Sequence, residues 1–178
     1  MLVVVVSGPV ASGKSTLSRA VAARLGETAG AAGAVIDLDL VYEMLDPQGR
    51  PKDDAVLWSA ARRVAGRLAS ALLAEGRPVV AEGDFFGERA LAEFVTELPS
   101  GVEPRLVLLG LDFPTAFARA SADPTRGLSK DPSFLARNYR EFAPGWDGRD
   151  VLHLHTGQMS VDEAASAVLI RLATAPPT

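Results

Sequence analysis

A short glycine-rich segment near the N-terminus constrains the fold of this chain more than any other feature. Residues 8–15 have the sequence GPVASGKS and satisfy the pattern G-x-x-x-x-G-K-[ST]. Consecutive valines at residues 3–6 precede it, and residues 15–25, with apolar side chains four positions apart, follow it. An uninterrupted β-branched run is typical of a strand buried on both faces, and the later spacing is typical of a helix. The sequence therefore predicts a strand, a glycine loop and a helix in succession.

The predicted loop has the chemistry of a polyphosphate-binding site. Glycines let the backbone approach an anion closely, and N–H groups of the loop and of the helix start then point at phosphate oxygens. We expect Lys14 to reach the β- and γ-phosphates and the Ser15 hydroxyl to bind Mg²⁺. The residues expected to contact a nucleoside triphosphate are Gly8, Ala11, Ser12, Gly13, Lys14, Ser15 and Thr16. The alternative is a glycine-rich strand-to-helix turn with an exposed lysine.

Strands and helices alternate along the rest of the chain. Strands are expected at residues 2–6, 34–40, 77–86, 103–113 and 150–156. Helices are expected at residues 15–25, 41–45, 55–75, 90–98, 114–121 and 160–173, the last with a capping box formed by Ser160 and Glu163. This alternation predicts an α/β fold in which helices cover both faces of a five-stranded parallel sheet. One domain over residues 1–178 is the simplest organisation.

Composition limits the classes of partner. The net charge is −4, whereas proteins that bind a nucleic-acid backbone usually carry a basic surplus, so a nucleic acid is an unlikely partner. The chain has no cysteine, which excludes disulfides and thiolate metal sites. No apolar run approaches the length of a membrane span, and residues 2–6 are too short for a signal peptide. We therefore expect a cytoplasmic protein without a membrane partner, and the sequence leaves the oligomeric state open.

Two aspartates end the second predicted strand. Asp37 and Asp39 lie at its carboxyl end, and we expect this strand to be next to the first. Ligands of open parallel sheets bind at that edge, where a carboxylate can accept or orient a hydroxyl proton during phosphoryl transfer. Both side chains would point to one face of an extended strand, so the choice of base between them stays open. Alternatively, Asp39 is only the N-cap of the helix at residues 41–45.

Further polar and aromatic residues are candidates for the same edge. Glu82 and Asp84 end the third predicted strand, where a carboxylate often holds Mg²⁺ or contacts substrate, although they do not form a strict Walker B pattern. The alternative is a pair of solvated carboxylates at the start of a loop. Tyr42 and Trp58 would line an acceptor pocket or pack in the core.

The glycine loop at residues 8–16 resembles that of the small P-loop kinases, and the resemblance covers nearly the whole chain. These kinases include shikimate and gluconate kinases, chloramphenicol phosphotransferase and the kinase domain of polynucleotide kinase. The resemblance is specific at the loop and looser over the rest of the chain. It implies a P-loop NTPase sandwich with a five-stranded parallel sheet, a helical lid at about residues 119–140, and transfer of the γ-phosphoryl group of ATP to a substrate hydroxyl. It also matches Asp39 to the aspartate that does the work of the base in chloramphenicol phosphotransferase and polynucleotide kinase.

The predicted lid is rich in basic side chains. Arginines supply fixed donors to a transferring phosphoryl group, and Arg126, in a turn beside Gly127, is the first candidate for closing over the nucleotide. Lys130 and Arg137 are candidates for substrate binding. The resemblance implies that Arg119 stacks on the adenine and that residues 156–160 hold its edge. The alternative is that these residues are solvated on a helical hairpin.

Together these features predict an ATP-dependent phosphotransferase with Mg²⁺ as cofactor and a small-molecule hydroxyl as acceptor. Asp39, Lys14 and Arg126 are the expected catalytic residues. Asp37, Tyr42, Glu82, Asp84, Lys130 and Arg137 are the expected acceptor contacts, and Ser15 and Glu82 are the expected metal ligands. The acceptor could be a sugar acid, a nucleoside or an antibiotic. The alternatives are a nucleotide-binding regulatory module and a simple NTP hydrolase.

Overall fold

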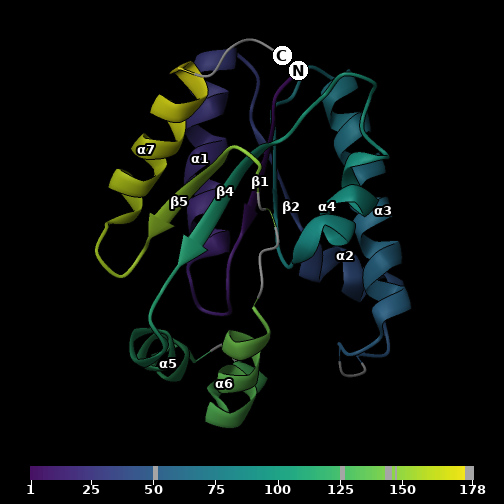
Figure 1. Ribbon diagram of the computed structural model, residues 1–178. Helices are drawn as coiled ribbons and strands as arrows, with labels where there is room; N and C mark the ends of the chain where they lie inside the picture. The colour runs from purple at the N-terminus through teal and green to yellow at the C-terminus, as the bar shows by residue number, and fades with distance from the viewer. Residues whose placement is uncertain (50–51, 125–126, 143–145, 147, 175–178) are drawn as a thin grey trace.

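A computed structural model describes residues 1–49, 52–124, 127–142, 146 and 148–174 (Figure 1). Its five strands form one sheet in the order β2-β3-β1-β4-β5, and every pair of neighbours is parallel. The strands are β1 (Val3–Ser7), β2 (Ala34–Asp37), β3 (Val79–Glu82), β4 (Arg105–Gly110) and β5 (Val151–His155). The predicted α/β fold with a five-stranded parallel sheet is therefore confirmed.

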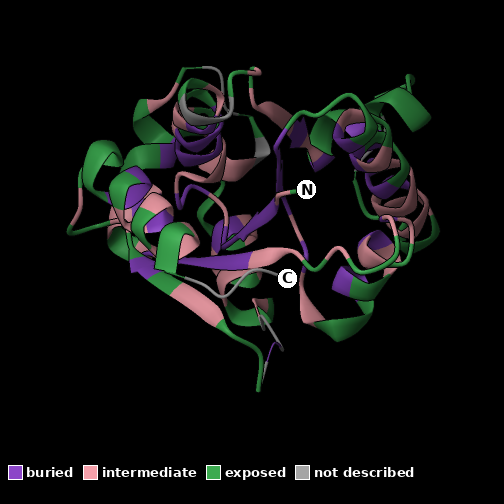
Figure 2. Cartoon of the chain, turned by 90° about the horizontal axis from the view of Figure 1, so that it is seen from above, coloured by how far each residue is buried: buried purple, intermediate pink, exposed green. Residues whose placement is uncertain are grey.

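Helices cover both faces of this sheet. They are α1 (Lys14–Ala29), α2 (Leu38–Leu45), α3 (Ala55–Ala74), α4 (Gly87–Val95), α5 (Phe113–Ala122), the 3₁₀-helix η1 (Leu128–Lys130), α6 (Pro132–Glu141) and α7 (Val161–Thr174). In Figure 1, α1 and α7 pack on one face, whereas α3 and α4 pack on the other. Residues buried in the central strands and on the inner faces of the helices form the core (Figure 2).

The central strand shows how the sequence specifies two cores. Val3 and Val5 belong to the cluster beneath α2, α3 and α4, whereas Val4 and Val6 belong to the cluster beneath α1 and α7. Side chains alternate between the faces of a strand, so an uninterrupted valine run is apolar toward both helical layers. Each buried valine contributes about 1.5–3 kcal/mol relative to an exposed one. This burial anchors the start of the glycine loop.

Two sequence-based expectations about the second strand are wrong. The strand does not lie next to β1, because β3 is inserted between them. It also ends at Asp37 rather than at residue 40. The Asp37 carboxylate accepts the backbone N–H groups of Asp39 and Leu40 at 2.9 Å and 3.4 Å and so starts α2 as its N-cap. Asp39 therefore lies in the first turn of a helix and does not share a strand face with Asp37.

Helices α5 and α6, which hold most of the predicted lid at about residues 119–140, form a separate small layer beyond the carboxyl ends of the strands (Figure 1). Figure 1 shows α5 and α6 beyond that edge of the sheet. Their apolar side chains form a third cluster, in which Ala116, Ala120 and Leu135 pack against Ala11 of the glycine loop and Leu111 after β4. The lid thus touches the loop directly. At the other end of the chain, the capping box before α7 is confirmed, because Ser160 and Glu163 exchange hydrogen bonds.

Within the described residues, no helix combines the length and the apolar character needed to cross a membrane.

Candidate active site

The glycine loop joins the end of β1 to the start of α1. Gly13 adopts a φ of 93° and precedes α1 without a side-chain cap, so the first N–H groups of the helix receive no bond from it. Ala11 has a φ of 65°, which is unusual for a residue with a Cβ. A Cβ on Gly8 would lie 2.9 Å from the backbone oxygen of Leu109 in β4. The loop is thus a close-packed turn whose N–H groups border the start of a helix.

The loop is held from two sides. On one side, the Val10 N–H donates to Asn138 Oδ1 at 3.0 Å, and the Tyr139 hydroxyl donates to the Val10 carbonyl at 3.3 Å, so α6 grips the tip of the loop. On the other side, the Thr156 hydroxyl donates to the Ser12 carbonyl at 2.8 Å, which ties the loop to the end of β5. These bonds fix the backbone and pre-organise its donors.

The side chains of Ser12 and Lys14 in the loop have donors that a bound ligand could use. The Ser12 hydroxyl is buried and has no hydrogen-bond partner among the described residues. Lys14 Nζ donates to the carbonyls of Gly8 at 2.8 Å and Pro9 at 3.3 Å and lies 3.6 Å from Asp84 Oδ1. A buried polar group without a partner costs free energy, and an anion in the loop would satisfy it. The residues therefore fit a polyphosphate.

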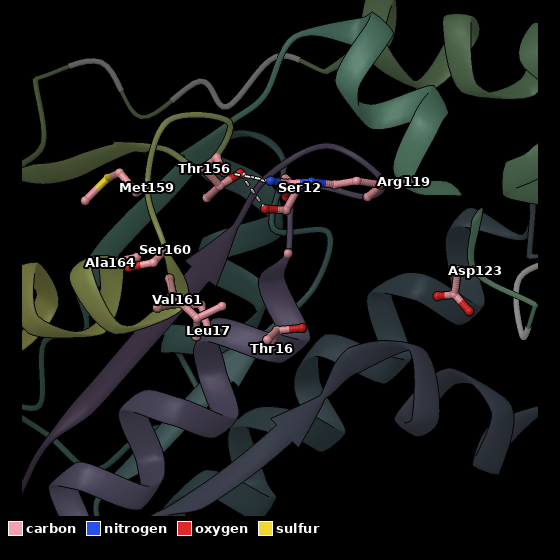
Figure 3. Close-up of a pocket in the computed structure, with 12 residues that line it drawn as sticks. Ser12, Thr16, Leu17, Arg119, Asp123, Thr156, Met159, Ser160, Val161 and Ala164 are labelled. Carbon is pink, nitrogen blue, oxygen red and sulfur yellow. Dashed lines mark hydrogen bonds between the residues drawn. The ribbon is translucent and has the colours of Figure 1, made fainter. Parts of the chain in front are cut away.

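A pocket of about 250 Å³ lies on the α7 side of the loop (Figure 3). Arg119 lines it, and its guanidinium donates to the Thr156 carbonyl at 2.8 Å. The apolar part of the wall comes from Ala11, Leu17, Met159, Val161 and Ala164, and the polar part includes Ser12, Thr16, Thr156 and Ser160. A planar guanidinium beside apolar side chains suits a flat aromatic ring.

A larger cavity of about 720 Å³ lies on the other side of the loop. It brings together residues that are far apart in the sequence, because the carboxyl ends of parallel strands meet at one edge. Besides the loop residues Val10 to Thr16, the lining consists of Asp39, Lys52, Asp53, Trp58, Glu82, Asp84, Phe134, Arg137, Asn138 and Glu141. Expected residues from outside the loop, namely Asp39, Glu82, Asp84 and Arg137, thus share one cavity with the expected loop residues.

Asp39 forms an ion pair with Lys52, which was not among the residues predicted from the sequence. Lys52 Nζ lies 2.6 Å from Asp39 Oδ1 and 2.9 Å from Glu43 Oε1. Although burial lowers the pKa of Lys52, hydrogen bonds and charge attraction from Asp39 and Glu43 raise it above its ordinary value. The Lys52 carbonyl also accepts the indole N–H of Trp58 at 3.1 Å. Lys52 therefore links the candidate base to an aromatic wall of the cavity.

Glu82 ends β3 and is only 3% exposed. The pKa of Glu82 is raised to about 7, mainly because burial disfavours the charged carboxylate. A hydrogen bond from the Ser15 hydroxyl lowers this pKa, whereas the negative charge of the neighbouring Asp37 raises it. Asp37 is its register partner on β2. Ser15 and Glu82 offer a hydroxyl and a carboxylate, which suits Mg²⁺, an ion that keeps several waters and takes few protein ligands. The described residues contain no group of three or more histidine, cysteine or acidic side chains able to hold a metal ion.

Asp84 lies two residues further along, near Lys14. Burial raises its pKa, the Lys14 ammonium lowers it, and the negative charge of Asp39 raises it. Its backbone carbonyl accepts Arg62 Nε at 3.2 Å, and Arg62 also pairs with Glu93 at 2.9 Å. Arg62 therefore anchors the segment after β3 to α3. Nothing in the local sequence marked Arg62, because its partners are distant in the chain.

Three further candidates are not among the residues that line this cavity, and a fourth lies outside the described residues. Tyr42 is only 2% exposed and packs behind Trp58, with ring centroids 4.5 Å apart, so it supports the cavity wall instead of lining it. Lys130 ends η1 and is not in the described lining of the cavity. Asp37 serves as the N-cap of α2. Arg126 lies outside the described residues.

The fold and the loop define this chain as a P-loop α/β protein. The chain belongs to the AAA domain family, whose model matches residues 3–132. No curated protein sequence matches it.

Solved structures share this fold over almost the whole chain. A sugar kinase from Janibacter sp. HTCC2649 aligns with a TM-score of 0.74 at 18% identity and covers 99% of this chain and 96% of its own. The APS kinase of Mycobacterium tuberculosis, in complex with AMPPNP and APS, aligns with a TM-score of 0.74 at 20% identity over 97% of this chain and 98% of its own. A gluconokinase from Sinorhizobium meliloti 1021 aligns with a TM-score of 0.67 at 22% identity over 97% and 93%. The resemblance to the fold of small P-loop kinases is confirmed.

Proposed function

We propose that the protein is a kinase that transfers the γ-phosphoryl group of ATP to a hydroxyl of a small molecule. The observation that carries this proposal is the 720 Å³ cavity, in which the glycine loop with Lys14 faces several carboxylates. A hydrolase needs room only for water beside the phosphates, whereas this cavity has room for an acceptor. The kinases of similar fold support the same class of reaction.

The nucleotide would bind across the glycine loop. Its base would enter the 250 Å³ pocket beside Arg119, and its phosphates would accept hydrogen bonds from the loop and the α1 N-terminus. Lys14 would leave the Gly8 and Pro9 carbonyls for the β- and γ-phosphates, and the Ser12 hydroxyl would gain a partner. Arg137, and Arg126 as first predicted, would bind the transferring group from the lid.

Ser15 and Glu82 would hold Mg²⁺, which when bound neutralises charge on the transferring phosphoryl group. Because a metal ligand must be ionised, Glu82 would release its proton on loading. Asp84, beside Lys14, would then complete the acidic side of the cavity.

Asp39 would act on the acceptor. Lys52 holds Asp39 Oδ1, and the second carboxylate oxygen would accept the hydrogen bond of the acceptor hydroxyl. A bond then forms between the hydroxyl oxygen and the γ-phosphorus, the bond from the γ-phosphorus to the β–γ bridging oxygen breaks, and the hydroxyl proton passes to Asp39. ADP leaves with the bridging oxygen.

The experiment is an ATP-dependent screen of hydroxyl-bearing metabolites and antibiotics with the wild type and Asp39→Asn. We expect transfer in the wild type and a loss of about 10²–10⁴-fold in kcat in the variant, because general base catalysis contributes that much. Calorimetric affinity for ATP should be unchanged. Phosphoryl transfer by Asp39→Asn at the wild-type rate would show that Asp39 is not the base. Wild-type hydrolysis at an equal rate without any acceptor would reject the kinase and support the hydrolase.

A further inference from the structure

Besides the phosphate-binding loop, two groups of residues line the large cavity where an acceptor would bind, and we call them its walls. We define the α2–α3 wall as Asp39, Lys52, Asp53 and Trp58, and the α6 wall as Phe134, Arg137, Asn138 and Glu141. Both walls follow from the fold, since α2 and α3 lie on one side of the loop and the lid on the other. The charges on these walls limit which acceptors can bind.

The α2–α3 wall has a surplus of negative charge. Its one ammonium, on Lys52, is shared between Asp39 at 2.6 Å and Glu43, outside the wall, at 2.9 Å, so its charge is already balanced by these carboxylates. Asp53 adds a further carboxylate beside it. An anionic group placed here would displace an existing ion pair and face the remaining carboxylates, which is unfavourable. Hydroxyl and ammonium groups, in contrast, would find acceptor oxygens.

The α6 wall carries one cation, Arg137, which the proposed function assigns to the transferring phosphoryl group. Arg137 precedes Asn138, whose side chain accepts the Val10 N–H at the tip of the glycine loop. Its guanidinium lies 5.6 Å from the Phe134 ring centroid. One helical turn further from the loop contact, Glu141 contributes a carboxylate to the same wall. With Arg137 assigned to the phosphoryl group, the charge that this wall leaves for an acceptor is the Glu141 carboxylate.

An aromatic ring completes the site. Trp58 is fixed by the hydrogen bond from its indole N–H to the Lys52 carbonyl at 3.1 Å and by packing on Tyr42. A fixed indole face attracts both the C–H face of a ring compound and a nearby ammonium group. Trp58 thus supplies affinity without demanding charge on the acceptor.

We infer that the acceptor is a polyhydroxyl ring compound without an anionic group, and that an amine on its ring strengthens binding. This inference rests on the proposed kinase function and narrows its acceptor class, because it removes sugar acids. It comes from the carboxylates of Asp39, Asp53 and Glu141, which line one cavity with Trp58 while Lys52 is already paired.

The test is a calorimetric titration of the full chain, with ADP and Mg²⁺ present, using three pyranoses that differ in charge. These are glucosamine at a pH where its amine is protonated, glucose, and glucuronate. Glucosamine should bind at least about tenfold more tightly than glucuronate at low salt, because a hydrogen bond to a charged group is worth that much. Glucuronate binding as tightly as glucosamine, or no binding by any of the three, would overturn the inference.

Matched variants locate the effect. Asp53→Asn and Glu141→Gln should each reduce the preference for glucosamine over glucuronate by about threefold or more, since each removes one charge partner. Glu75→Gln, at the C-terminal end of α3 and outside both walls, should leave the preference unchanged. An equal effect of all three variants would show that net charge alone acts, and would overturn the assignment to these walls.

A phosphoryl-transfer assay separates this inference from the proposed function. Transfer to a sugar acid in preference to an amine would overturn the inference and leave the kinase intact. Selective binding of the amine without transfer to any acceptor would leave the binding class intact and count against the kinase.

Discussion

At the scale of single residues, Asp39 shows how a candidate base is positioned. Its carboxylate is held through Lys52, which in turn contacts Glu43 and, through its carbonyl, Trp58. The sequence marked Asp39 because it lies at the carboxyl end of a predicted strand and because the resemblance to small P-loop kinases matches it to a base. It gave no sign of Lys52, which lies in a turn-rich stretch and reaches Asp39 only once α2 and α3 are packed. Side-chain pairs of this kind follow from tertiary structure.

Replacing Lys52 tests this link. Lys52→Met keeps the aliphatic chain and removes the ammonium, so Asp39 loses the partner that orients it. We expect kcat to fall about tenfold or more while the affinity for ATP stays within about twofold, because a charge-assisted hydrogen bond is lost only at the acceptor side. Steady-state kinetics would measure both. Arg77→Met, at the opposite edge of the sheet, is the matched control. Equal kcat values for the Lys52 variant and the wild type would show that Lys52 does not orient Asp39 for the reaction.

The raised pKa of Glu82 predicts that the stability of the metal-free protein depends on pH. Burial raises this pKa from 4.5 to about 7, so between these values the folded state binds more protons than the unfolded state. The free energy of unfolding should therefore fall as pH rises through this window, by up to about 3 kcal/mol from this group. Urea unfolding at pH 5 and pH 8 with a chelator would measure it. Glu82→Gln should lack this component, and the same slope in both proteins would contradict the assignment.

At the scale of elements, the glycine loop depends on its fit against β4. Gly8→Ala would place a Cβ 2.9 Å from the Leu109 oxygen and 2.7 Å from the Ser12 hydroxyl. The loop would have to move away from the sheet, and such overpacking costs typically about 1–3 kcal/mol. We expect a lower free energy of unfolding, measured in urea, and a loss of ATP affinity. A variant that binds ATP as tightly as the wild type would show that the loop tolerates the shift.

The boundary between β2 and α2 shows the limit of reading elements from sequence. The alternation of apolar and acidic residues from Val35 to Leu40 suits a strand, and it predicted one up to residue 40. The Asp37 carboxylate instead binds two N–H groups and starts a helix. Local patterns favour both outcomes there, and the cap decided between them. The β1–loop–α1 unit, in contrast, was predictable because its strand, loop and helix signals are all strong.

At the scale of the whole molecule, alternation of strands and helices was enough to predict a parallel sheet, but not the order of its strands. The order β2-β3-β1-β4-β5 places β3 beside β1, so Glu82 lies between the glycine loop and Asp37. The 250 Å³ pocket lies toward α7, and the 720 Å³ cavity lies toward α2 and α3. Several expected site residues therefore meet at one edge, whereas Tyr42 and Lys130 are not among the residues that line the cavity.

The calorimetric affinity of Lys14→Ala for ATP, measured beside the wild type and Arg77→Ala, tests whether the glycine loop binds the triphosphate. If the loop, Ser12 and Lys14 form the phosphate site, removing the ammonium should weaken binding by about tenfold or more, since a charge-assisted contact to phosphate is lost. The Arg77 control should bind as the wild type does. An unchanged affinity in Lys14→Ala would contradict the central claim that this loop holds the triphosphate.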